Sequence, residues 1–430
     1  MHKNTRDYLT TYLNIDKKIV DLCINCEEEV KGQFVKIDEV REYNQYKVLN
    51  SMKKNRLSDI HFNPSTGYGY GDIGRDTLDR VYADTFMCED AFVRWNIVSG
   101  THALSLCLFA LLRPGDEMLS ITGKPYDTLD NIIGIKETPP GNLRDYNVSY
   151  KQCDLTVDGK IDYDAIKSNL GSKTKLVFIQ RSTGYDWRHS FSIDDIREAI
   201  NYVKSLKQDV YCMVDNCYGE FLDFKEPTEI GADIMAGSLI KNPGGSIAPT
   251  GGYIAGKRTL IDMVAGRLIA PGMGRECGAT LGINRLLFQG LFMAPHVVSE
   301  AIKGAVLCAK IFSKLGYEVN PQYNSHRSDI IQAIKFKNSK ALINFCQGIQ
   351  AGSPVDSFVT PEPWDMPGYN DKVIMAAGGF VQGSSIELSA DAPIRPPYIA
   401  YLQGGVTYDH AKIGLLFALQ KLMEEKCITI

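Results

Sequence analysis

Two apolar runs near the middle of the chain each lead to a charged residue. Residues 210–214 end at Asp215, and a second run leads through Ser238 to Lys241, after which the chain enters the sequence NPGG. In an open α/β sheet, ligands bind outside the carboxyl ends of the strands. The two runs therefore predict neighbouring buried strands that bring Asp215 and Lys241 to the same edge of a sheet.

Segments with strand and helix patterns alternate from about residue 59 to residue 295. The predicted strands lie at 116–121, 174–180, 209–215 and 251–256. One helix is expected to begin near Ala103, and another to run from the N-cap residue Ser192 to Lys207. This alternation is typical of a mainly parallel sheet covered by helices, so we predict an α/β fold.

The chain of 430 residues is long enough for two domains with large cores. Residues 1–58 are interpreted as an N-terminal helical arm that wraps a partner subunit. Residues 59–295 are predicted to form a large domain. Residues 296–430 are predicted to form a smaller C-terminal α/β domain, whose first helix ends at Gly316. We interpret the Pro-rich stretch 353–370 as a functional loop.

The chemistry of Lys241 and Asp215 points to one type of cofactor. A lysine that leaves a buried strand is poorly solvated, and desolvation is expected to lower its pKa and make the amine a nucleophile and base. A carboxylate at a neighbouring strand end can pair with a protonated ring nitrogen. Pyridoxal phosphate, an aldehyde with a pyridinium nitrogen, needs both groups. The pair therefore predicts a pyridoxal-phosphate site.

The other parts of such a site occur in the expected order along the chain. A phosphate group binds to backbone N–H donors at a helix N-terminus, and Ser99, Gly100 and Thr101 stand between a predicted strand and an apolar helix. Ser238 lies one turn before Lys241. Tyr126 follows a short strand and is a candidate to stack on the cofactor ring.

Each of these residues also has an ordinary structural interpretation. Asp215 alone is typical of a strand-end cap, Lys241 alone of a solvated loop, and Tyr126 alone of a packing aromatic. SGTHA alone is an ordinary helix start. Their combination in this order, each at a strand end, favours the cofactor site.

Seven segments resemble a known family of enzymes. They read YGYGDIGRDTLDRVYADTF, SGTHAL, VDNCYGEF, SLIKNPGG, GRECG, SSIELSADAP and YLQGGVTYDH, and they run from Tyr68 to His410. In them the chain is similar to the fold type I, aspartate-aminotransferase-like pyridoxal-phosphate enzymes. Within these it resembles the cystathionine/methionine γ-lyase group, in particular its bacterial aluminium-resistance or methionine γ-lyase-like proteins. VDNCYGEF and SLIKNPGG are the most specific segments.

The resemblance implies roles for the candidate residues. Lys241 would hold the cofactor covalently, Asp215 would pair with its ring nitrogen, and Tyr126 would stack on the ring. The phosphate would be bound by Ser238, Gly100 and Thr101.

The resemblance also implies shared active sites in a homodimer or homotetramer. A Tyr-x-Arg pair of the neighbouring subunit reaches the phosphate in the lyase group. Tyr68, Tyr70 and Arg75 occupy the corresponding region of this chain at a different spacing, so either tyrosine is a candidate.

The chain departs from the lyase pattern at two places. The loop QRSTGYDWR, residues 180–188, lacks the asparagine that the lyases carry near the cofactor. Glu387 stands where the lyases have an arginine for the substrate carboxylate. An arginine is expected somewhere, because its planar fork matches a carboxylate. Arg395 and Arg181 are the candidates.

Composition excludes several other classes of protein. The formal net charge of −4 predicts no basic face for nucleic acid. The sequence contains no run of 18 apolar residues, so no membrane span is predicted. The eleven scattered cysteines suit a reducing cytoplasm. Cys23 and Cys26 form a CxxC within a helical pattern, where two helix cysteines are favoured over a zinc or redox site, and no metal site is predicted elsewhere.

The predicted function is a pyridoxal-phosphate-dependent carbon–sulfur lyase. Its substrate would be a sulfur-containing amino acid of the cystathionine, methionine or cysteine type, and both β- and γ-elimination remain open. Two alternatives also remain. One is another enzyme on the same cofactor, an aminotransferase or a cysteine desulfurase, for which Cys277 is a candidate. The other is a cofactor-binding regulator without turnover.

Overall fold

The computed structural model describes residues 1–135, 140–366 and 371–430. They form two compact units. The large unit is Tyr43–Ala294, and the small unit combines Met1–Glu42 with Pro295–Ile430. The residues expected to form a separate N-terminal arm, 1–58, are thus divided between the two units.

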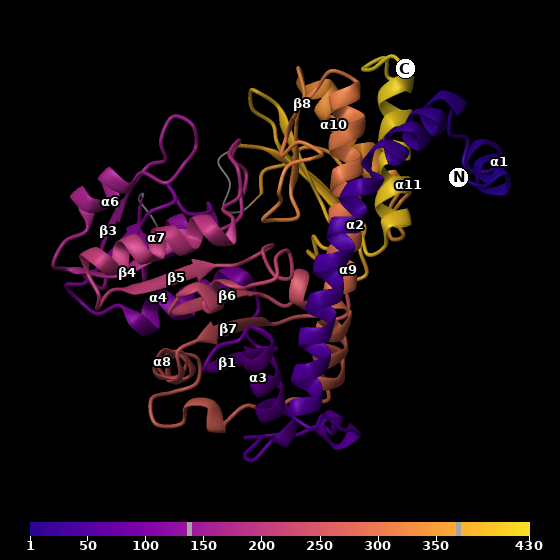
Figure 1. Ribbon diagram of the computed structural model, residues 1–430. Helices are drawn as coiled ribbons and strands as arrows, with labels where there is room; N and C mark the ends of the chain where they lie inside the picture. The colour runs from indigo at the N-terminus through magenta and orange to yellow at the C-terminus, as the bar shows by residue number, and fades with distance from the viewer. Residues whose placement is uncertain (136–139, 367–370) are drawn as a thin grey trace. The chain divides into compact units, whose positions relative to one another are not determined.

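A seven-stranded sheet forms the centre of the large unit (Figure 1). Its strands follow the order β1-β7-β6-β5-β4-β2-β3. Among the described strands of this sheet, β7 alone runs antiparallel to its neighbours. The predicted α/β fold with a mainly parallel sheet is confirmed. The strands are β1 (Asp90–Arg94), β2 (Glu117–Ser120), β3 (Ser149–Gln152), β4 (Thr174–Gln180), β5 (Tyr211–Asp215), β6 (Ile234–Ser238) and β7 (Gly252–Gly256).

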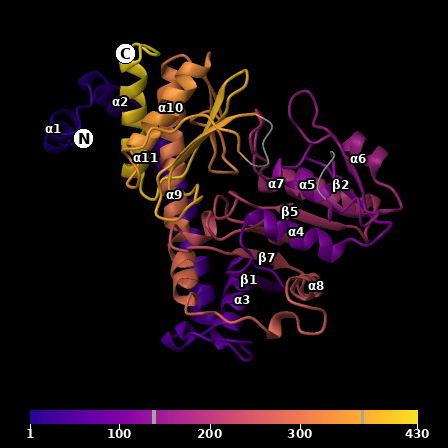
Figure 2. The same ribbon diagram turned by 180° about the vertical axis from the view of Figure 1, so that it is seen from behind.

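Helices cover both faces of this sheet. α7 lies in front of the sheet in Figure 1 and α4 lies in front of it in Figure 2, so the two helices are on opposite faces. The central strands are buried almost throughout, which explains their nearly continuous apolar sequences. The α-helices are α3 (Ile73–Thr85), α4 (Gly100–Leu111), α5 (Thr128–Ile133), α6 (Tyr163–Asn169), α7 (Ile193–Leu206) and α8 (Arg258–Leu268), and the 3-10 helices are η1 (Asp59–Phe62), η2 (Pro227–Ile230), η3 (Asn242–Gly244) and η4 (Gly274–Glu276).

The predicted ends of α7 agree with the structure to within a residue. The Ser192 side chain accepts a hydrogen bond from the backbone N–H of Asp195, and the Asp195 side chain accepts one from the backbone N–H of Ser192. This reciprocal capping satisfies two N–H groups that the first turn of a helix leaves free. The start of α7 is therefore encoded locally.

The small unit contains an antiparallel sheet with strand order β10-β11-β12-β9-β8. α10 and α11 pack closely on each other, because Gly348 of α10 and Gly352 at its C-terminal cap present no side chain to α11. A Cβ atom at Gly348 would lie 2.4 Å from Ala418 Cα. The elements are α1 (Lys3–Thr11), β8 (Glu318–Asn320), β9 (Gln332–Lys335), α10 (Ser339–Ala351), β10 (Val373–Ala377), β11 (Ser389–Pro393), β12 (Ile399–Gln403) and α11 (Tyr408–Glu424). The last four residues of the Pro-rich stretch 353–370 lie outside the described residues.

Two long helices, α2 (Lys17–Lys54) and α9 (Asn284–Lys314), contribute residues to both units. Cys23 and Cys26 are buried side by side along α2, which confirms two helix cysteines. α9 begins twelve residues before the predicted start at 296 and contains Pro295. Proline removes one helical hydrogen bond, but the helix continues because its apolar stripe is buried on either side of Pro295, at Leu291 and Val298.

By length and composition, α9 is the one helix in the described ranges that is apolar enough to cross a membrane. In its most apolar window, 72% is buried inside the fold. Burial of this extent is typical of a core helix.

Candidate active site

Three parallel strands of the large unit end side by side and carry the predicted site residues. Gln180 at the end of β4 pairs in register with Asp215 at the end of β5, and Asp215 pairs with Ala236 of β6. Ser238 ends β6, and Lys241 follows three residues later. The shared direction of these strands brings side chains far apart in the sequence to one edge, as predicted.

Lys241 is half-buried and lies over an aromatic ring. Its Nζ atom is 3.9 Å from the ring centroid of Tyr218. Burial by itself would lower the pKa of Lys241, but Cys217, Tyr218 and Asp215 outweigh burial and raise the pKa above its ordinary value. The expected lowering of this pKa was wrong, because desolvation was considered without the acidic neighbours that the fold supplies.

Asp215 is buried, with 5% of its surface exposed. Its Oδ1 atom accepts a hydrogen bond of 3.1 Å from the backbone N–H of Cys217. Burial raises the pKa of the Asp215 carboxyl, while Lys241 and the amide and thiol of Cys217 oppose this rise. A buried carboxylate with a cation beside it has the electrostatic surroundings that a pyridinium partner requires.

The N-terminus of α4 lies next to the end of β6 and to the turn after β5. A Cβ atom built on Gly100 would lie 3.1 Å from Cys217 Sγ and 3.4 Å from Ser238 Cβ. The bare backbone of Gly100 therefore forms a cradle against Cys217 and Ser238, at the end of the helix whose first N–H groups have no partner within the helix. The Ser99 side chain caps the helix by accepting a hydrogen bond from His102 N, and Thr101 Oγ1 lies 2.9 Å from Thr128 Oγ1.

Tyr126 reaches the same edge through β4. Its backbone N–H donates a 2.7 Å hydrogen bond to Gln180 Oε1, and Gln180 is the register partner of Asp215. A Cβ atom at Gly184, where φ is +61°, would lie 3.3 Å from the Tyr126 ring. Gly184 thus leaves room for this tyrosine, although neither Gln180 nor Gly184 was predicted from the sequence as a site residue.

The two candidate arginines have different surroundings. Arg181 is fully buried, and its guanidinium donates to Asp223 Oδ2 at 2.8 Å, Gly219 O at 2.8 Å and Asn216 Oδ1 at 2.9 Å. These bonds hold the turn after β5, so we assign Arg181 a structural role. Arg395, in the small unit, is half exposed and pairs with Asp371 at 2.8 Å.

Glu387 in the small unit accepts hydrogen bonds from the backbone of a nearby loop. The carboxylate is buried and accepts hydrogen bonds from Phe380 N at 2.6 Å and Val381 N at 2.9 Å. In this structure the residue that replaces the lyase arginine orders a loop of its own chain.

The tyrosine loop of residues 67–71 is ordered by its own chain. Arg75 is buried and donates to Gly69 O at 2.8 Å and Gly278 O at 3.1 Å. A contact with a neighbouring subunit is therefore not required to order this loop. Tyr68 and Tyr70 remain exposed by 68% and 63%, and their rings stack at 5.4 Å.

Cys277, the residue considered for desulfuration, is 5% exposed. A hydrogen bond with Cys277 raises the pKa of Tyr70. A thiol held in this way differs from the mobile loop cysteine that a desulfurase needs.

Two residues near Lys241, Tyr218 and Glu220, were not predicted from the sequence as site residues. Tyr218 lies in the turn after β5 and has a φ of +71°. This left-handed conformation is uncommon outside glycine. Glu220 is fully buried beside Tyr218. The signal was available in VDNCYGEF, where several chemically active side chains follow a buried strand.

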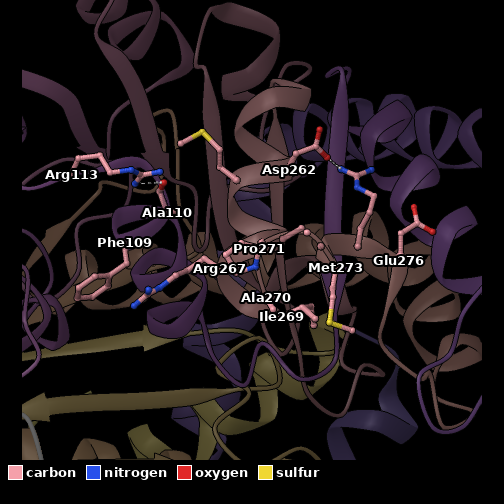
Figure 3. A pocket seen from close by; sticks show the side chains of 16 residues that line it. Phe109, Ala110, Arg113, Asp262, Arg267, Ile269, Ala270, Pro271, Met273 and Glu276 are labelled. Carbon is pink, nitrogen blue, oxygen red and sulfur yellow. Dashed lines mark hydrogen bonds and ion pairs between the residues drawn. The ribbon is translucent and has the colours of Figure 1, made fainter.

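A separate hollow of about 760 Å³ lies on the large unit, at α8 and the loop that follows it (Figure 3). Its wall includes Phe109 and Arg113 of the α4 region, together with Arg267, Pro271 and Met273. It contains none of the predicted site residues.

The site residues fit pyridoxal phosphate on two structural grounds. Gly100 provides a cradle that a Cβ atom would fill, directly beside Ser238. Lys241 and the buried Asp215 interact electrostatically at neighbouring strand ends. Together they provide an anion-binding helix end, an amine and an acid on one side of the sheet.

Comparison with known proteins gives consistent matches. A family model described as methionine gamma-lyase matches residues 19–423. A carbon–sulfur lyase involved in aluminium resistance from Clostridium novyi NT has a solved structure with 54% identity and a TM-score of 0.95, over 98% of this chain and 100% of that one. A putative cystathionine beta-lyase involved in aluminium resistance from Clostridium acetobutylicum has 55% identity and a TM-score of 0.95, over the same shares. The uncharacterised protein YnbB of Bacillus subtilis is 53% identical over 403 residues, which are 94% of this chain and 96% of that protein.

Proposed function

The chain belongs to the methionine γ-lyase family, and from that premise we propose that Lys241 and Asp215 form the catalytic centre of a carbon–sulfur lyase that acts on a sulfur-containing amino acid. Family membership confirms the predicted enzyme class, the fold and the cofactor, pyridoxal 5′-phosphate. The individual site residues remain our assignment.

One observation carries the assignment. Lys241 is the cation that lies in electrostatic contact with the buried Asp215, and both residues stand where parallel strands end beside the start of α4. The geometry supplies an amine, an acid and a phosphate cradle within one unit of the chain.

Each residue then has a defined task. Bound pyridoxal phosphate supplies an acceptor for the electrons released at the substrate Cα. Asp215 would keep the ring nitrogen protonated, and Lys241, in its neutral amine form, would remove the Cα proton. Tyr126 would stack on the ring and would donate a proton to the departing thiolate, as a positioned acid.

Recognition of the phosphate is assigned to the start of α4 and the end of β6. Ser99 fixes the first turn, Gly100 and Thr101 present backbone N–H groups, and Ser238 adds a hydroxyl. We further propose a cytoplasmic homo-oligomer in which Tyr70 of one subunit completes the phosphate site of another. Arg395 is the arginine that we propose for the substrate carboxylate, because its side chain is half exposed although it pairs with Asp371, whereas Arg181 is fully buried.

The substrate class is a 2-amino acid whose Cβ or Cγ carries sulfur. Its cleavage would yield a 2-oxo acid, ammonia and a thiol. The name of the Clostridium acetobutylicum protein supports cystathionine as the first compound to assay.

The decisive experiment combines a substrate panel with one substitution. Purified protein is incubated with cystathionine, cysteine and methionine, and thiol and 2-oxo acid are measured. We expect Lys241→Ala to abolish release of both products, whereas Lys225→Ala, which changes an exposed lysine of the same unit, should retain full activity. Thiol release by Lys241→Ala at the wild-type rate would overturn the assignment.

A further inference from the structure

Gln180 is a buried amide to which the proposed reaction assigns no task. It ends β4, and 4% of its surface is exposed. Its Oε1 atom accepts a 2.7 Å hydrogen bond from the backbone N–H of Tyr126, and its Nε2 atom donates a 3.2 Å hydrogen bond to Ser182 O. An N–H group on one side and a carbonyl on the other determine which end of the amide is the oxygen. The side chain is therefore held in one orientation.

The loop that carries Tyr126 is fastened to Gln180 at a second point. The backbone N–H of Gln180 donates a 2.9 Å hydrogen bond to Oγ1 of Thr122, which is buried directly after β2. The backbone of Gln180 thus holds the start of this loop, and its side chain holds the loop at Tyr126. Two attachments on one short loop leave the residues between them little conformational freedom.

The aromatic ring of Tyr126 is held by the same segment of the chain. A Cβ atom at Gly184 would lie 3.3 Å from the Tyr126 ring and 3.3 Å from Gln180 Nε2. Glycine, which also tolerates the φ of +61° at this position, leaves room for both. The ring of Tyr185 lies 5.7 Å from the ring of Tyr126, at an interplanar angle of 59°. Residues 180–185 therefore fix both the backbone and the ring of this tyrosine.

Gln180 also connects Tyr126 to the acid of the candidate site. Gln180 pairs in register with Asp215 across β4 and β5. The next residue, Arg181, donates a 3.2 Å hydrogen bond from its backbone N–H to Asp215 O. Tyr126 and Asp215 therefore belong to one hydrogen-bonded frame, and Gln180 is the residue that joins them.

We propose that Gln180 is a positioning residue that sets where the Tyr126 ring lies over the bound cofactor. The proposal rests on the function assigned above to Tyr126 and Asp215. Without the Gln180 amide, the Tyr126 N–H loses this acceptor and the loop is free to shift relative to β4. A misplacement of about 1 Å in a reacting group can cost about 10²-fold in rate, so Gln180 acts on the reaction without touching the substrate.

The test compares Gln180→Met, which keeps a side chain of similar length and removes both polar atoms, with Gln152→Met. Gln152 ends β3 of the same sheet, and its amide likewise accepts from Tyr150 Oη at 2.8 Å and donates to Asp154 at 2.7 Å. We expect Gln180→Met to raise the Kd of pyridoxal phosphate, measured by equilibrium dialysis, by about tenfold. The visible circular dichroism of the bound cofactor, which reports how its ring is held, should change as well. Gln152→Met should alter neither quantity.

A double-mutant cycle separates positioning of the ring from a general structural role. If Gln180 acts through the Tyr126 ring, Gln180→Met should change the cofactor Kd by less than about twofold in a Tyr126→Ala background, because the ring that it positions is gone. A merely structural residue would change the Kd by the same factor in both backgrounds, and that result would overturn the inference. If Gln180→Met fails to fold, Gln180→Asn retains an amide, withdraws it by one methylene and enters the same cycle.

Wild-type values of the Kd and the circular dichroism in folded Gln180→Met would equally overturn the inference. Unchanged cofactor binding in Tyr126→Ala alone would remove the stacking role on which it rests. These failures are distinct from failure of the proposed function, in which the wild-type protein would release no thiol or Lys241→Ala would still release it.

Discussion

Lys241 and Asp215 illustrate how two residues set each other's charge. Asp215 is buried, and burial alone would favour its neutral form. The ammonium group of Lys241 stabilises its ionised form, and Asp215 in turn helps to raise the pKa of Lys241. Removal of the charge on either residue therefore changes the pKa of the other.

Asp215→Asn is predicted to retain the fold and most of the bound cofactor but to lose most activity. The amide still accepts the hydrogen bond from Cys217 N, but it cannot stabilise a protonated ring nitrogen. We expect kcat to fall by about 10²-fold or more, the scale of a lost positioned electrostatic group. Steady-state kinetics and cofactor absorbance provide the measurement. Near-normal turnover would identify Asp215 as a structural cap.

Glu220 is predicted to make the protein less stable as pH rises. Its pKa is raised by burial from 4.5 to about 8, so between these values the native state binds a proton that the unfolded state has lost. The free energy of unfolding therefore falls with increasing pH, by at most about 1.4 kcal/mol per pH unit for one proton.

Glu220→Gln should remove this part of the pH dependence. Denaturant unfolding at pH 5.5, 6.5 and 7.5 (about one-unit steps across the window) checks the prediction, and Glu229→Gln, which removes a carboxylate paired with Lys47, is the control. Equal slopes for wild type and Glu220→Gln would contradict the raised pKa.

At the scale of elements, close helix contacts depend on glycine where backbone meets backbone. The contact of α10 with α11 is an example, since a Cβ atom at Gly348 would meet the backbone of Ala418 at 2.4 Å. Backbone atoms cannot move aside as the end of a flexible side chain can. A side chain added at Gly348 would therefore force the two helices apart.

Gly348→Ala is accordingly predicted to destabilise the protein by about 1–3 kcal/mol, the usual cost of overpacking. The matched control is Gly32→Ala in α2, where no atom lies within 4 Å of the added Cβ. The control should gain about 0.5–1 kcal/mol, because alanine is the better helix former. Thermal unfolding of both variants measures the difference, and a stabilised Gly348→Ala would mean that α10 and α11 pack less closely.

At the scale of the whole molecule, the exposed tyrosine loop bears on assembly. Arg75 fixes this loop from inside, while Tyr68 and Tyr70 project from it. An ordered loop with two exposed stacked aromatics is suited to contact another subunit, because little conformational entropy is lost on binding.

Subunit mixing tests the shared sites directly. Tyr70→Ala and Lys241→Ala homo-oligomers, each inactive or nearly so, are combined under conditions that exchange subunits. Hybrids should regain activity, because some of their sites contain both intact residues. If exchange is demonstrated by mass and no activity returns, Tyr70 serves the site of its own chain or lies outside it.

Much of the fold follows from local sequence patterns. The strand 174–180 and the cap at Ser192 were predicted and are present, whereas the helix expected to begin near Ala103 begins at Gly100. These features depend on hydrogen bonds and burial periodicity within a few residues, so they can be recognised in the sequence. The alternation of strands and helices likewise determined the parallel sheet and the edge at which Asp215, Ser238 and Lys241 meet.

The tertiary structure decided the properties that depend on neighbours distant in the sequence. The sequence contained Glu220 and Tyr253, but only folding brings them together over Gly237. Folding also turns Arg75 inward to Gly278 and reverses the expected pKa shift of Lys241. Strand ends are encoded by residue patterns within a short segment, so the sequence determined where the site lies. A pKa and a hydrogen-bond partner depend on the charges and the burial that the whole fold creates. The tertiary structure therefore decided how the groups of the site are charged.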